Sequence, residues 1–222
     1  MKMIVCLLFA ASFASASVAQ DVGGDKKGEQ KIKFTGGPIV EMNASGFIHS
    51  GIAGGRSEME IGANVGGFLD MGIADWFSVQ CGMVFQYKTS RQSWRQESGR
   101  FEYVGVEVPV YAMFHVPLRG GGRFSVGVGP YTDFGFSASY KVGGHSLDVY
   151  EKNDATGLPA MKDNDTGFGF KLGYEFSSGL QVNATYRVSV TNVIDANSNK
   201  AKMYPQAMSV GVAYRFGKGK KR

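Results

Sequence analysis

Cysteine is scarce in this sequence, and its two cysteines are not expected to form a disulfide. Cys6 lies in an N-terminal apolar stretch and Cys81 lies far from it. If the N-terminal stretch is removed on export, Cys81 is the single cysteine of the mature chain. An internal disulfide and a cysteine-based metal site are therefore both excluded.

Long apolar runs are also missing. After the N-terminus no run approaches the roughly 18 apolar residues of a membrane-spanning helix, which argues against a helical membrane protein. Disorder is disfavoured too, because aromatic residues make up 13% of the chain and the net charge is only +5. Much of the positive charge lies in polar tails rather than on a folded face with interleaved aromatics, so we expect no nucleic-acid partner.

Residues 1–19 have the pattern of a signal peptide. Lys2 supplies the positive start, Ile4 to Ala16 is apolar or small without any acid, and Ser17-Val18-Ala19 fits a small-x-small cleavage pattern. A transmembrane anchor is the alternative, but the stretch is short and rich in Ala and Ser. Cys6 lies inside the apolar region rather than at the cleavage point, which argues against lipoprotein processing.

The mature chain divides into three parts. Residues 20–37 are polar and glycine-containing and predict a flexible lead-in, residues 38–217 carry a repeated strand pattern, and residues 218–222 form a basic tail. In the strand region apolar residues recur at every second position over segments of about ten residues, which is the pattern of membrane barrel strands. The eight segments are Ile39–His49, Met59–Met71, Phe77–Lys88, Glu102–Val116, Arg123–Tyr140, Gly167–Phe176, Leu180–Thr191 and Ala207–Phe216. We therefore predict an all-β fold, an eight-stranded antiparallel up-and-down transmembrane β-barrel.

A soluble β-sandwich is the competing fold. The connections favour the barrel, because tight turns such as Ser177 to Gly179 alternate with longer polar loops such as Lys141–Thr166. The aromatics agree, since they gather near both ends of the predicted strands with smaller aliphatics between them. Two such girdles match the two interfaces of a bilayer.

The positions between the apolar ones predict a polar interior. An eight-stranded barrel is only wide enough for side chains to fill it. Buried charges persist only when they are paired and hydrogen-bonded, so we expect a closed, salt-bridged lumen rather than a small pore. The charged residues predicted to face inward are Glu41, Asp70, Glu107, Asp133, Lys171, Glu175, Arg187 and Arg215.

Catalytic and metal chemistry have little support in the sequence. The chain has three histidines, and His49, near the outer end of the first strand, is the one that could serve a lipid-directed enzyme. His115 lies at the opposite rim and His145 in the longest loop. That loop is acidic but lacks the spacing of an EF-hand, so we expect neither a metal nor a cofactor.

The chain resembles the PorT-like outer-membrane β-barrel domains of Bacteroidota between about Pro38 and Phe216. The resemblance is carried by Glu107-Val108-Pro109, Gly127-Val128-Gly129-Pro130-Tyr131, Tyr186-Arg187 leading to Thr191-Asn192, and the ending Val210 to Phe216. It implies location in the cell outer membrane, contact with outer-membrane lipid, and insertion by the barrel assembly machinery through a final strand that ends in an aromatic residue. Phe216 takes that place, although six residues follow it. We expect a non-enzymatic barrel with a structural or interaction role through its extracellular loops, whose partner is unknown, with a lipid-directed enzyme or a small pore as alternatives.

Overall fold

The computed structural model describes residues 32–51, 55–94, 97–151, 161–194 and 202–216, and most of these residues lie in antiparallel strands. The strands are β1 (Lys33–Ser50), β2 (Gly55–Ala74), β3 (Phe77–Trp94), β4 (Glu97–Pro117), β5 (Arg123–Val142), β6 (His145–Asp148), β7 (Asn164–Glu175), β8 (Leu180–Ser189) and β9 (Lys202–Tyr214). Among these residues no helix is long and apolar enough to cross a membrane. The predicted signal peptide and basic tail lie outside the described residues.

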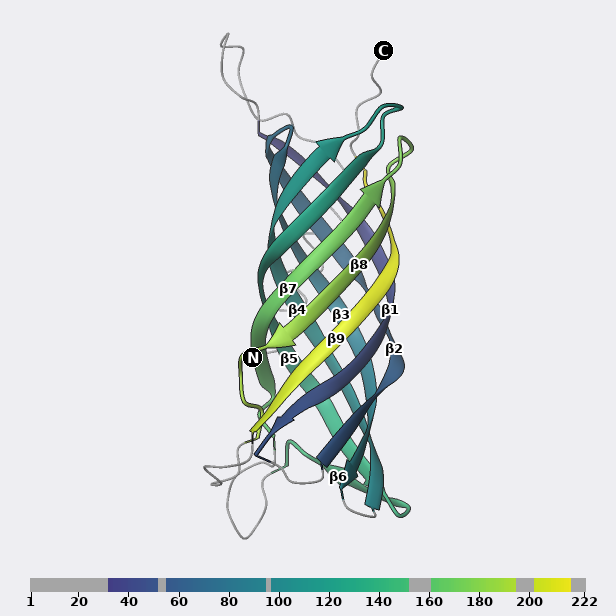
Figure 1. Cartoon of the computed structure of the whole chain (residues 1–222), viewed down its shortest axis with the longest axis vertical. Helices are drawn as coiled ribbons and strands as arrows, with labels where there is room; N and C mark the ends of the chain where they lie inside the picture. The colour runs from purple at the N-terminus through teal and green to yellow at the C-terminus, as the bar shows by residue number, and fades with distance from the viewer. Residues whose placement is uncertain (1–31, 52–54, 95–96, 152–160, 195–201, 217–222) are drawn as a thin grey trace.

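Eight of the strands close into a ring, as predicted. The hydrogen-bonded order is β4-β3-β2-β1-β9-β8-β7-β5, and pairing of β4 with β5 closes the sheet. The strands tilt around a tall barrel, with the short turns at its upper end in Figure 1. The four-residue β6 pairs only with the far end of β5 and forms a small hairpin at the lower end.

The strand faces follow the period-two pattern of the sequence. In β8 every second residue is buried, so Gln181, Asn183, Thr185 and Arg187 face the lumen while Val182 and Ala184 face outward. Apolar side chains cover the outside, with Val210 60% exposed, whereas the Glu107 carboxylate in the lumen is fully buried. This reversal of the usual soluble pattern is what a barrel in lipid requires.

Lumenal glycines make room for tyrosine rings. A Cβ on Gly167 would lie 2.6 Å from the hydroxyl oxygen of Tyr131, and one on Gly169 would lie 2.8 Å from a ring carbon of Tyr111. Both distances are far below van der Waals contact. The many glycines noted on the inward face are therefore needed, at least at these two positions, to seat rings against the barrel wall.

Several element boundaries differ from the prediction. The first strand begins at Lys33, inside the segment expected to be a flexible lead-in, because Lys33 to Gly37 pair with the end of β2. Residues 89–100, between the predicted strands Phe77–Lys88 and Glu102–Val116, were expected to form a loop. They are mostly strand, since β3 and β4 stay paired out to Trp94 and Glu97. The outward positions in this stretch are polar, as at Arg91 and Arg100, so the apolar alternation that marks a strand disappears there.

Candidate functional site

The centre of the lumen is organised around Arg187 of β8. Its guanidinium donates to Glu107 Oε1 of β4 at 2.8 Å, to Ser209 Oγ of β9 at 2.9 Å and to Glu41 Oε2 of β1 at 3.3 Å. Glu41 also accepts from Asn64 at 3.0 Å, and Ser209 donates to the same carboxylate oxygen at 2.9 Å. One buried cation thus joins strands that are not neighbours in the ring, with its charge matched by carboxylates.

A second cluster lies nearer the short-turn end, around Arg215. It donates to Glu175 Oε2 at 2.8 Å, to Thr35 Oγ1 at 2.5 Å and to Asp70 Oδ2 at 3.3 Å. Arg123 reaches the same Glu175 oxygen at 3.0 Å, so two guanidinium groups share one carboxylate. Charge-assisted contacts of this kind are about twice as strong as neutral hydrogen bonds.

His115 is held between two serines at this end. Its Nε2 lies 2.7 Å from Ser78 Oγ and its Nδ1 lies 2.7 Å from Ser125 Oγ, while Ser78 donates to Asp70 at 3.1 Å. The carboxylate therefore contacts the serine and not the imidazole, unlike the acid–histidine–nucleophile order of a catalytic triad. The cavity beside it is only about 10 Å³, which leaves no room for a substrate.

Lys171 is buried without a direct ion pair in the described structure. Its ammonium donates to Gln80 Oε1 at 2.8 Å and lies 5.9 Å from the ring centroid of Phe68, over which Arg215 also sits at 5.5 Å. Phe68 belongs to a small apolar cluster with Ile39, Val84 and Ala213. The lumen is thus not uniformly salt-bridged: one level of it is apolar and aromatic.

The level nearest the long-loop end contains two charged residues that the sequence did not reveal. Lys88 donates to Asp133 Oδ2 at 2.7 Å. Asp165, expected to belong to a loop, lies at the start of β7 and accepts from Ser189 and, at 3.4 Å, from Tyr131. Of the eight predicted lumenal residues, all have buried side chains, and the structure brings seven into ion pairs, Lys171 being the exception.

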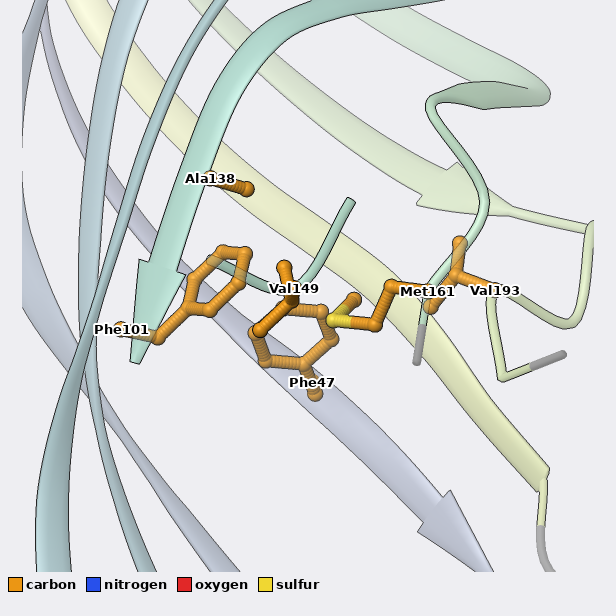
Figure 2. Close-up of a cluster of buried hydrophobic side chains, with 6 residues drawn as sticks. All are labelled: Phe47, Phe101, Ala138, Val149, Met161 and Val193. Atoms are coloured by element: carbon orange, nitrogen blue, oxygen red, sulfur yellow. The ribbon is translucent and has the colours of Figure 1, made fainter. Parts of the chain in front are cut away.

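An apolar cluster covers this end of the lumen (Figure 2). Phe47 and Phe101 project inward from β1 and β4 and pack edge to face with centroids 5.0 Å apart. Ala138 of β5 and residues from the connecting segments complete the cover. It consists of Phe47, Phe101, Ala138, Val149, Met161 and Val193. Beneath it lies a cavity of about 50 Å³, room for a few water molecules, beside Lys88 and Asp133.

The cavity wall also carries Tyr150, which lies in the connection after β6. Burial, and then the charge of nearby Asp163, raise the pKa of its hydroxyl well above the ordinary value, so the phenol stays protonated. Within the described residues no group of three or more His, Cys, Asp or Glu side chains is placed to hold a metal ion. What the lumen can do chemically is lock the barrel wall and obstruct passage.

Comparison with known proteins places this architecture in a family. The chain is similar to OprG of Pseudomonas aeruginosa, with a TM-score of 0.51 and 13% identity over 86% of this chain and 99% of that one. Similarity to Ail of Yersinia pestis (TM-score 0.41, 14% identity, 82% of this chain and 98% of that one) and to Neisserial surface protein A (0.45, 11%, 82% and 96%) is lower in structural score. No curated protein matches the sequence. Residues 4–216 match the family described as outer membrane protein beta-barrel domain, and the chain belongs to this family of small outer-membrane barrels.

Proposed function

We propose that this protein is a closed, non-enzymatic outer-membrane barrel that acts through its extracellular surface, with a structural or interaction role. The observation that carries the proposal is the obstructed lumen. Arg187 joins β8 to β4 and β1 across the interior, and the apolar cover around Phe47 and Phe101 lies between these ion pairs and the long-loop end. A path for ions would have to break buried ion pairs and pass through an apolar constriction.

The long-loop end is the end that we assign to the cell exterior. Short turns on the periplasmic side and longer connections outside are typical of bacterial barrels. β2 to β5 contain 18 to 21 residues each, whereas β7 to β9 contain 10 to 13, so one side of the wall rises well above the other. This raised wall and the connections beside it are the surface available to an extracellular partner.

Finer identity rests on the PorT-like resemblance. The Glu107-Val108-Pro109 segment lies in β4 with Glu107 at the centre of the lumen, and Phe216 bridges to Gly36 beside the last strand. We infer export through the signal peptide of residues 1–19 and insertion by the barrel assembly machinery. The secretion role from which the family takes its name is not part of the proposal.

A lipid-directed enzyme centred on His49 is the weaker alternative. The polar groups that face His49 are the backbone of Gly55 and the side chain of Gln92. In the described part of the chain no hydrogen bond joins this imidazole to a serine or a carboxylate, so neither a nucleophile nor an orienting acid accompanies it.

Two measurements test the proposal. Purified protein in planar bilayers is expected to give no stable conductance steps where a known porin does, and such steps would refute the closed lumen. Incubation with phospholipid and lipid A is expected to release no product. Turnover by the wild type that is lost in His49→Ala would establish the enzyme instead.

A further inference from the structure

Three cations occupy directly opposite positions on neighbouring strands near the extracellular end. Arg91 of β3 pairs with Arg100 of β4, and Arg100 pairs with Lys141 of β5. Like charges placed directly opposite one another on a sheet destabilise it. We call Arg91, Arg100 and Lys141 the cationic row.

Carboxylates accompany the cationic row on its own face, two of them within ion-pair distance and a third, Glu58, directly opposite Arg91 on β2. Glu60 lies 3.3 Å from Arg91 and 3.0 Å from Arg100, and Glu102 lies 2.8 Å from Lys141. Glu60 and Glu102 are largely covered, with side chains 21% and 22% exposed, whereas the three cations are 49% to 56% exposed. The row therefore presents three accessible cationic donors to whatever lies outside the barrel.

The height of the row on the wall identifies its surroundings. Alternation places Arg91 on the same outward face as Tyr87, which is 41% exposed, and Phe85, which is 44% exposed. Arg91 lies four positions after Tyr87, so with a strand rise of about 3.3 Å and a tilt near 40° the row stands about 10 Å beyond the aromatic girdle, toward the long-loop end. Girdle rings lie at the membrane interface, and groups this far above them lie among the lipid headgroups.

The row also borders a concave surface. An open hollow of about 490 Å³ is lined by all three cations and by Ser98, Ser146 and the turn between β5 and β6. Ser146 is the direct cross-strand partner of Lys141, so a hydroxyl continues the row. Gly143 and Gly144 in the turn have positive φ, which lets the backbone fold back over the hollow.

We propose that the cationic row binds the phosphate groups of the glycolipid in the outer leaflet. Guanidinium forks match phosphate oxygens in pairs, and Lys141 and the hydroxyls supply further donors. The anion would relieve the repulsion between the directly opposite cations, Arg91 with Arg100 and Arg100 with Lys141. This inference goes beyond the proposed function, because lipid binding neither needs nor excludes an extracellular partner.

The test is equilibrium binding of fluorescent bis-phosphorylated lipid A to the full chain folded in detergent. Each cation near an anionic surface contributes about fivefold in affinity, so Arg91→Gln with Arg100→Gln and Lys141→Gln should weaken binding on the order of 100-fold. A charge-matched control, Lys33→Gln with Arg119→Gln and Lys202→Gln, removes cations elsewhere and should stay within about twofold of wild type. If the first triple variant does not fold, as judged by its heat-dependent gel shift, Arg91→Gln and Lys141→Gln are measured singly for the fivefold effect.

Further binding measurements distinguish the source of the anion. Lipid A without phosphates should bind weakly, equimolar inorganic phosphate should not displace the lipid, and Glu60→Gln with Glu102→Gln should strengthen binding severalfold. Equal binding by the triple variant and its control would overturn the proposal. So would displacement by inorganic phosphate or tighter binding of a sulfated polysaccharide, which would make the row a site for a soluble anion or an extracellular carbohydrate.

Discussion

Replacing Arg187 by methionine tests whether the lumen is held by paired charges. The substitution keeps an unbranched side chain but leaves Glu107 and Glu41 buried without their shared cation, at side-chain exposures of 0% and 1%. Removing one partner of a buried pair costs about 3–5 kcal/mol, and we expect that loss in the free energy of unfolding. Glu107→Gln alone removes one charge-assisted hydrogen bond and should cost about 1.5–3 kcal/mol.

The effect of Glu107→Gln on stability should change sign when Arg187 has already been replaced by methionine. Once Arg187 is absent, Glu107 is an uncompensated buried charge, so adding Glu107→Gln should raise stability by about 1–3 kcal/mol. Urea unfolding in lipid vesicles, monitored by gel mobility and tryptophan fluorescence, gives the stability of the wild type, the two single variants and the double variant, which together form a double-mutant cycle. Lys171→Met is the matched control, because the principal partner of Lys171 is the neutral amide of Gln80, and it should cost less than Arg187→Met. A loss below about 1 kcal/mol for Arg187→Met, or additive effects in the cycle, would refute the reasoning.

Four further predictions concern the outer face, the wall and the orientation. Ala184 is exposed on the outside of β8, so Ala184→Lys should destabilise the barrel by about 2–4 kcal/mol in vesicle unfolding while Ala184→Leu does not; equal effects would place this face out of lipid. Cys81 is exposed on β3 and should react with a lipid-soluble maleimide but not with a charged one, and the opposite selectivity would place it in water. Gly169→Ala should cost about 1–3 kcal/mol because its methyl group meets the Tyr111 ring, and Tyr111→Leu should recover part of that loss if the ring is the cause. Protease added to intact cells should cut between β6 and β7 and spare a C-terminal tag; loss of the tag would reverse the orientation.

Strand identity and facing were predictable wherever one face meets lipid. The alternation in Leu180 to Thr191 assigned Arg187 to the lumen, and the structure gives the same facing. Pairing partners were not predictable, because they depend on the register around the whole ring. Arg187 and Glu41 are 146 residues apart in the sequence, and a pattern within one strand cannot predict a contact between residues so far apart.

The part near the long-loop end was predicted least well. Lys88 was taken as the end of a strand because the apolar alternation stops after it, and Asp165 as part of a loop because the alternation begins only after it, at Gly167. The inward position of Phe47 and Phe101 was predictable. Each lies an even number of positions from an inward-facing glutamate on the same strand, Phe47 from Glu41 and Phe101 from Glu107, so alternation puts it on the inward face. Aromatic residues were considered only as outward-facing girdles, and Phe85 and Tyr87 do face outward, whereas Phe47 and Phe101 are buried on the inward face.

A polar lumen also follows from how such a strand must reach its membrane. If the inward face of β8 were as apolar as Val182 and Val188, the strand would be a ten-residue apolar run, and several such runs would compete for insertion or aggregation during export. Alternating polar residues keep each strand half polar, which disfavours both outcomes. Closure then brings those polar groups into a narrow space, where charges that remained single would each cost several kcal/mol. Partnered charges such as Arg187 with Glu107 satisfy both requirements, and the obstructed lumen is the consequence.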